Sequence, residues 1–213
     1  MRRFFAQCLV GAVAVVWLVT AGAADLVEGR NYTRLKVPQP VESGNKIEVI
    51  EFFSYGCPHC ADLEPYLQNW LKTLPADVAF HRVPVIFQER WKALARIYYT
   101  LDALGDAARL SPEVFQAIHV RGLSLWDDKA FYDWAASNGL DRAKVAATYT
   151  SFGVDSKVKR ALALAQTYNV QSVPTVVVDG KFITGSERVG GHAMMPAAVD
   201  ALIAKARAER AKS

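Results

Sequence analysis

The sequence is poor in cysteine, in concentrated charge and in long apolar runs. Its 213 residues include three cysteines, at positions 8, 57 and 60. The 25 basic residues exceed the 21 acidic residues by four, and they cluster only in the tail, residues 205–212. This balance gives no support for nucleic-acid binding. Apolar residues make up 52% of the chain, and repeats are absent, so we expect one folded domain with or without an insertion.

The one long apolar run lies at the N-terminus and has the features of a secretion signal. Arg2 and Arg3 precede an uncharged apolar stretch, residues 8–19, which is followed by the small residues Ala21-Gly22-Ala23-Ala24. A basic start, a short apolar centre and an Ala-x-Ala site define a cleavable signal peptide, and this run is too short to span a bilayer comfortably. We expect residues 1–24 to be removed, leaving a soluble exported protein.

Loss of the signal peptide leaves Cys57 and Cys60 as the only cysteines, in the run Cys57-Pro58-His59-Cys60. The apolar residues 47–53 before this run predict a buried strand, and the pattern after it predicts a helix over residues 58–72. A thiolate at a helix N-terminus is stabilised by free backbone N–H groups and by the helix dipole. We therefore expect Cys57 to be exposed and acidic, with His59 adding positive charge and Cys60 more deeply buried.

A structural disulfide and a metal site are the two simpler interpretations of this motif. A disulfide that closes a four-residue loop stabilises a fold by only about 2 kcal/mol, because the loop entropy it removes is small. A structural zinc site needs four ligands, and the remaining histidines, His81, His119 and His192, are scattered along the chain. We therefore favour a redox-active pair, with no metal site and no bound cofactor.

The rest of the sequence predicts an α/β fold interrupted by helices. A second strand is expected over residues 78–85, completing a strand–helix–strand unit with a parallel crossover. Two further strands, residues 174–178 and 181–184, flank Asp179-Gly180, a strong hairpin signal. A last helix covers residues 194–210, and Ser111 and Asp141 are expected to cap helices. The intervening helices are predicted at residues 90–104, 112–122, 129–138, 142–150 and 156–169.

The run Glu51-Phe-Phe-Ser-Tyr-Gly-Cys-Pro-His-Cys60, the pair Val173-Pro174 and the helical block between them resemble the DsbA family of the thioredoxin superfamily. The resemblance implies a thioredoxin fold, residues 25–88 and 170–213, with an inserted helical domain, residues 89–169. It implies that Pro58 and His59 tune the redox pair and that Val173 and a cis Pro174 bind substrate backbone.

The resemblance also implies an acidic residue beneath the disulfide, here Glu51. The family's basic partner on the next strand is Lys, whereas the nearest residue by spacing is Arg82, which cannot release its proton as Lys can. A wet strand edge or a purely structural ion pair is the alternative interpretation of Glu51.

The function that the resemblance implies is oxidation of reduced, unfolded exported proteins, with reoxidation by a DsbB-type membrane quinone reductase. The signal peptide predicts a periplasmic location, and a monomer is the default expectation. Two other functions are considered. A disulfide reductase or isomerase would use the same motif, although isomerases carry a dimerisation domain for which the segment before Ile47 is too short. A chaperone-like peptide-binding module would function without its cysteines.

Overall fold

The described part of the protein is residues 26–212 of a computed structural model. The predicted signal peptide, residues 1–24, lies outside these residues. Across residues 26–212, every helix is either too short or too polar to cross a bilayer.

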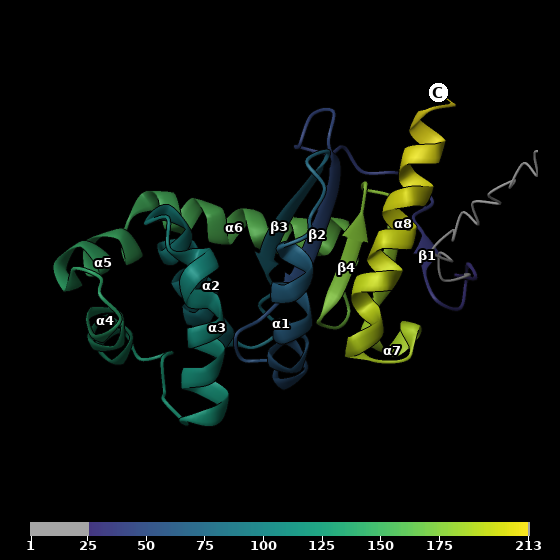
Figure 1. The fold of residues 1–213 in the computed structure, drawn as a ribbon. Coiled ribbons are helices and arrows are strands. Elements are labelled where there is room, and N and C mark those ends of the chain that lie inside the picture. The colour runs from purple at the N-terminus through teal and green to yellow at the C-terminus, as the bar shows by residue number, and fades with distance from the viewer. Residues whose placement is uncertain (1–25, 213) are drawn as a thin grey trace, which may run out of the picture.

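A five-stranded sheet in the order β1-β5-β4-β2-β3 forms the centre of the fold (Figure 1). The central strand β2 is apolar apart from two glutamates, and all seven of its residues are buried. It runs parallel to β3 and antiparallel to β4, so the predicted strand–helix–strand crossover is confirmed. The strands are β1 (Thr33–Arg34), β2 (Ile47–Phe53), β3 (Val78–Pro84), β4 (Thr175–Val178) and β5 (Phe182–Gly185).

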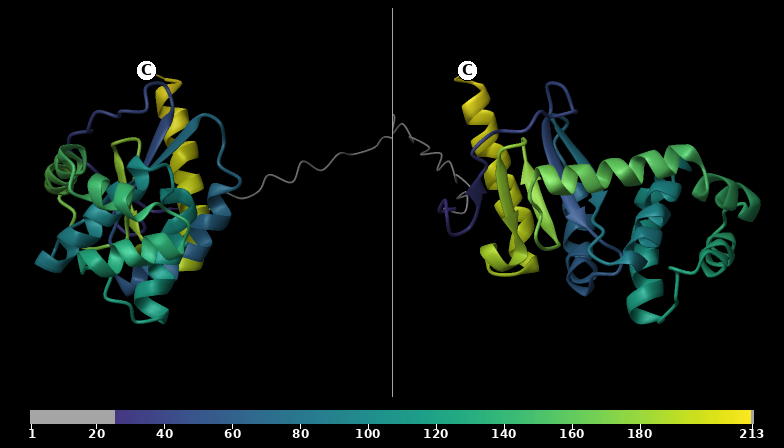
Figure 2. Two further views of the ribbon diagram at one scale, coloured as in Figure 1. Left: turned by 90° about the vertical axis from the view of Figure 1, so that its left-hand side faces the viewer. Right: turned by 180° about the vertical axis from the view of Figure 1, so that it is seen from behind.

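Helices cover both faces of the sheet. The helices α1 (Pro58–Leu71) and α8 (Met195–Arg210) lie over one face, and α6 (Phe152–Thr167) crosses the other in the view from behind (Figure 2). On the α6 side, the rings of Phe52 and Tyr168 have centroids 5.4 Å apart. The core on the α1 and α8 side includes Val49, Leu63, Leu67, Val176, Val199 and Leu202.

The helices predicted between the second and third long strands form an insertion between β3 and β4. The mixed α/β thioredoxin fold with a helical insertion is thereby confirmed. A continuous apolar core joins this insertion to the sheet, because Phe52, Phe53 and Val83 pack in the same cluster as residues of the inserted helices. The insertion consists of α2 (Glu89–Ala103), α3 (Ala107–Phe115), the π-helical turn η1 (Gln116–Val120), α4 (Asp128–Ser137), α5 (Arg142–Tyr149) and α6.

Two helix starts differ from the sequence prediction. The helix expected to begin at Pro112 begins at Ala107, and Ser111 is buried inside it instead of capping it. Burial of Leu110 along with the following apolar residues extends this helix upstream of its proline. The helix expected from residue 156 begins at Phe152, because the Ser151 hydroxyl accepts a hydrogen bond from the Val154 N–H.

A predicted turn and a predicted helix cap are present, and two short helices near the C-terminus were not predicted. Asp179 and Gly180 both have positive φ, 56° and 61°, as expected for a two-residue hairpin turn. Asp141 caps α5 as predicted, since its carboxylate accepts from the Lys144 N–H at 2.7 Å. The helix α7 (Ser186–Val189) and the 3-10 turn η2 (His192–Met194) were not expected from the sequence.

Candidate active site

Cys57 and Cys60 lie where β2 gives way to α1, as the motif predicts. The strand ends at Phe53, and Cys57 occupies the N-cap position with extended backbone angles, φ −95° and ψ 117°. Pro58 follows at the start of the helix, where its missing N–H has no intrahelical partner to lose. Cys60 is one helical turn further and faces the interior. Both residues are free cysteines in this structure.

The expected exposure of Cys57 is wrong. Cys57 is 6% exposed and Cys60 is fully buried, so only the predicted order of burial is correct. The Cys57 sulfur lies 3.4 Å from the Val173 carbonyl oxygen, and this backbone, 116 residues later in the chain, helps to cover the sulfur. Sequence spacing within the motif could not reveal a cover supplied from so far away.

The two thiols have pKa values displaced in opposite directions. The pKa of Cys57 is lowered to about 6, chiefly by a hydrogen bond from the Cys60 side chain. Burial opposes this, whereas the N–H groups of Cys60 and His59 and the charge of His59 assist it. Burial raises the pKa of Cys60 well above its ordinary value, and the hydrogen bond to Cys57 adds to the rise. Cys57 is therefore the thiolate at neutral pH, and Cys60 keeps its proton.

A buried network of three charges lies beneath the pair. Arg82 Nε donates to Glu51 Oε2 at 2.7 Å, and its guanidinium also donates to both oxygens of Glu64, at 2.5 and 3.3 Å. Parallel pairing of β2 with β3 puts Glu51 and Arg82 directly in register, so the uncertain pairing is present. One cation thus neutralises two buried carboxylates only in part.

Glu51 is the member of this network whose charge interacts with both cysteines. Burial raises the pKa of its carboxyl, against the lowering effect of Arg82, and the charges of Glu64 and Cys57 raise it further. Its Oε1 atom is buried and has no hydrogen-bond partner among the described residues. The charge on Glu51 also raises the pKa of Cys60. A carboxyl with one unpaired oxygen beside a thiol that must gain and lose a proton is suited to proton exchange.

The Val173–Pro174 peptide bond is cis, in agreement with the family resemblance. It borders a cavity of about 640 Å³ whose lining includes His59, Val173, Pro174 and the segment from Gly185 to His192. The predicted redox-tuning residue His59 and the predicted substrate-binding residues Val173 and Pro174 therefore share one groove beside Cys57.

The helical insertion holds the loop that presents Cys57. The Tyr55 hydroxyl bonds to the Ser111 hydroxyl in α3 at 2.7 Å, and the Tyr55 carbonyl oxygen lies 2.7 Å from His119 Nε2 in η1. The indole of Trp91 in α2 packs on Gly56 so closely that a Cβ at Gly56 would lie 2.6 Å from it. Three elements of the insertion thus fix the two residues before Cys57.

Sequence reasoning missed Glu64 and the partners of Tyr55. A signal for Glu64 was present, because Cys60, Leu63, Glu64 and Leu67 follow the spacing of one buried helix face. A carboxylate within such a face needs a buried partner. The partners of Tyr55 left no such signal, since their positions depend on how the insertion folds back on the sheet.

Comparisons with known proteins agree with this geometry. The model of the DSBA-like thioredoxin domain matches residues 63–193, starting just after Cys60. The thiol:disulfide interchange protein DsbA of Bordetella parapertussis is 39% identical over 204 residues, 95% of this chain and 97% of that relative. DsbA of Pseudomonas aeruginosa is 37% identical over 201 residues, 94% of this chain and 95% of that relative. Both alignments extend across the cysteine pair.

Solved structures show the same fold. The crystal structure of Pseudomonas aeruginosa DsbA superposes with a TM-score of 0.84 at 38% identity, covering 90% of this chain and 99% of the other. Reduced DsbA1 from Neisseria meningitidis gives a TM-score of 0.78 at 30% identity, covering 89% of this chain and all of the other. On the combined strength of motif, fold and similarity, this chain belongs to the DsbA family of thiol:disulfide oxidoreductases.

Proposed function

We propose that this protein oxidises newly exported, reduced proteins by donating its Cys57–Cys60 disulfide to them. The observation that carries the proposal is the position of Cys57 at the N-terminus of α1, where its pKa is lowered to about 6. A stabilised thiolate stabilises the reduced enzyme relative to the disulfide, and a disulfide whose reduced form is favoured is a strong oxidant. Cys60 is fully buried and its pKa is raised, so the substrate thiolate attacks Cys57 and not Cys60.

The reaction begins when a substrate thiolate attacks the Cys57 sulfur. The bond between Cys57 and Cys60 breaks, its electron pair passes to Cys60, and Cys60 takes up a proton, for which Glu51 is the nearby exchange group. A second substrate thiolate then attacks the substrate sulfur of the mixed disulfide. Cys57 leaves as a thiolate, which its low pKa favours. Two electrons have moved from the substrate dithiol to the enzyme.

An extended substrate segment docks in the groove beside Val173. Val173 and Pro174 supply backbone against which a peptide can pair, and the Val173 carbonyl oxygen lies next to the Cys57 sulfur. Peptide backbone bound there places a substrate cysteine at the reacting atom. Recognition through backbone suits an enzyme that acts on many unfolded proteins.

The compartment and the electron acceptor complete the proposal. The signal peptide, residues 1–24, directs export to the periplasm, where disulfides persist, and is then removed. A membrane quinone reductase of the DsbB type reoxidises the Cys57–Cys60 dithiol, using the same groove as the substrate. The protein acts as a monomer, and the disulfide itself is the only redox group that the reaction requires.

The equilibrium redox potential of the mature chain tests the direction of transfer. The protein would be equilibrated in glutathione buffers of graded ratio, quenched by alkylation and resolved by mass. We expect a potential above about −200 mV, well above the roughly −270 mV of thioredoxin. A thioredoxin-like value would overturn the proposal and indicate an exported reductase.

A Cys57→Ser, Cys60→Ser double variant is the matched control for a peptide-binding function. We expect it to be unable to restore activity to a reduced, disulfide-dependent substrate such as ribonuclease A. If the double variant promoted refolding as well as the unmodified chain does, peptide binding rather than disulfide donation would be the function.

A further inference from the structure

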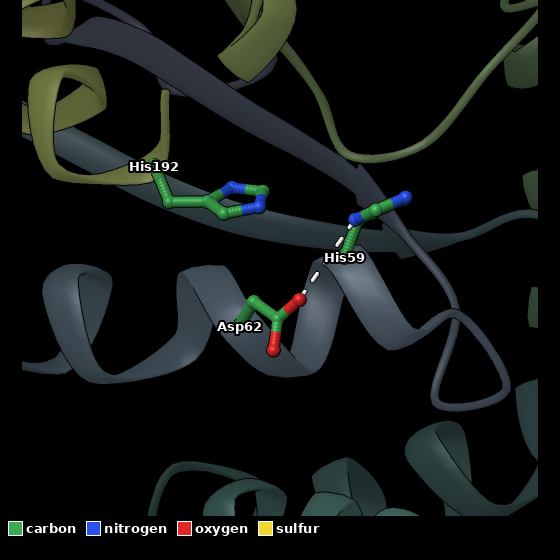
Figure 3. A group of neighbouring side chains, drawn as sticks. All are labelled: His59, Asp62 and His192. Atoms are coloured by element: carbon green, nitrogen blue, oxygen red, sulfur yellow. Dashed lines mark ion pairs between the residues drawn. The ribbon is translucent and has the colours of Figure 1, made fainter.

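Three potential metal ligands lie together beside the groove that Val173 and Pro174 line. His59 and Asp62 project from the first turns of α1, and His192 projects toward them from η2 (Figure 3). One ligand atom of each lies within 4.8 Å of the other two. His59 Nδ1 is 3.8 Å from Asp62 Oδ2, and the two histidine rings have centroids 5.9 Å apart. The scattered histidines of the sequence thus include two that the fold brings together.

His192 is held in a way that suits a metal ligand. Its Nδ1 atom lies 2.8 Å from the hydroxyl oxygen of Ser186, which is itself 6% exposed. A proton on Nδ1 donated to this oxygen leaves the Nε2 lone pair free to bind. Metal-binding histidines almost always use their second nitrogen in such an orienting hydrogen bond.

The spacing of the ligand atoms requires only a small adjustment. Around a tetrahedral ion with bonds of about 2.1 Å, ligand atoms are roughly 3.4 Å apart. Atoms within 4.8 Å of one another therefore need to close by about 1.4 Å or less. The side chains of His59 and Asp62 are 70% and 62% exposed, so they can turn without repacking the core.

We propose that His59, Asp62 and His192 form a binding site for a divalent transition metal, with Zn²⁺ as its ligand. Two imidazoles and one carboxylate are borderline and hard donors that suit Zn²⁺, and three protein ligands leave one coordination position open. Two of the three ligands, His59 and His192, also line the groove with Val173 and Pro174. A metal held by them would lie beside the groove in which we propose that the substrate peptide docks.

The site shares one residue with the redox centre, and this has a thermodynamic consequence. His59 is both the proposed ligand and one of the groups that interact with the Cys57 sulfur. If Zn²⁺ binds the dithiol and disulfide forms with different affinities, the metal must shift the redox equilibrium by the same factor. Such a difference would link metal availability to the activity of the enzyme.

Zinc binding to the oxidised mature chain tests the site without any contribution from cysteine thiolates. Isothermal titration calorimetry with Zn²⁺ alone should give one ion per chain. We expect His192→Ala and Asp62→Asn each to weaken binding at least tenfold. Ser186→Ala, which removes the orienting bond and no ligand, should also weaken it about tenfold. His81→Ala, at an exposed histidine on β3, is the matched control and should leave the affinity unchanged.

Co²⁺ provides a second readout, because a tetrahedral site gives intense visible absorption that an octahedral surface site does not. Binding by His192→Ala with the affinity of the unmodified chain would overturn the proposal, as would weak absorption by bound Co²⁺. His192→Gln, checked by circular dichroism, replaces His192→Ala if that variant does not fold. Because the titration uses no substrate, it remains decisive whether or not the protein proves to be an oxidant.

Discussion

Ionisation of Cys57 affects both its attack on other sulfurs and its departure from a mixed disulfide. The ratio of thiolate to thiol can be calculated from its pKa. With a pKa of about 6, the ratio of thiolate to thiol at pH 7 is about 10 to 1. A free cysteine with a pKa of about 8.5 has a ratio near 1 to 30. The protein therefore carries roughly 30 times more reactive thiolate than an unperturbed cysteine would at this pH.

This gain is largely offset when Cys57 attacks another sulfur. Nucleophilicity falls by about 0.4 to 0.5 logarithmic units per pKa unit, so a shift of about 2.5 units costs roughly tenfold. The net advantage in attack at pH 7 is only about threefold. The low pKa therefore serves mainly to make Cys57 a good leaving group, the role it has when the enzyme donates its disulfide.

Thiolate absorbance near 240 nm, followed from pH 3 to 9 in the reduced mature chain, checks this reasoning. We expect a single inflection near pH 6, absent from Cys57→Ala, because Cys60 does not ionise in this range. Cys60→Ala should move the inflection upward, since the Cys60 hydrogen bond is the largest cause of the lowered pKa of Cys57. His59→Ala should move it upward by less. An inflection near 8.5 in the unmodified chain, or no change in Cys60→Ala, would refute the account.

Three further predictions concern stability, measured by urea denaturation. In the reduced protein, the lowered pKa of Cys57 stabilises the folded state fully at pH values above the unfolded-state pKa of about 8.5, and not at all well below pH 6. The difference in free energy of unfolding between the unmodified chain and Cys57→Ala should therefore shrink as pH falls through this window. Arg82→Met should lower the free energy of unfolding by about 3 to 5 kcal/mol at pH 7, because it leaves two buried carboxylates without a cation, and by less at pH 5. Unchanged stability would contradict a stabilising role for Arg82 in this network. Gly180→Ala should lower the free energy of unfolding more than Gly105→Ala does. Both glycines have positive φ, but of the two only Gly180 would place a Cβ against backbone, 2.2 Å from the Gln39 carbonyl oxygen. Equal losses of about 1 to 2 kcal/mol in the two variants would rule out the clash.

The redox motif and the topology around it could be predicted because they depend on local chemistry. A buried strand, a Cys-x-x-Cys motif and a proline at the first helical position locate Cys57 at a helix N-terminus with no knowledge of the rest of the chain. The Asp179-Gly180 turn is likewise fixed by two residues that tolerate positive φ. Such features need no information from distant segments.

Features that depend on long-range packing could not be predicted. Burial of Cys57 by Val173, the Tyr55–Ser111 bond and the approach of His192 to His59 each join residues far apart in the sequence. Ser111 illustrates the difficulty, since a Ser before Pro at a plausible helix start favours a cap. Tertiary packing instead draws the helix upstream and gives the hydroxyl a buried partner.

The long separation between Cys57 and the groups around it sets an order of events during synthesis. The Val173 carbonyl oxygen comes 116 residues after the sulfur it contacts. At roughly 5 to 20 residues per second, a ribosome needs on the order of 10 s to add that length of chain. Throughout this interval the nascent cysteines lack the cover that Val173 provides. The groups that lower the pKa of Cys57 lie within residues 57–60, so a chain that ends before Val173 would carry a reactive cysteine without the backbone that covers it.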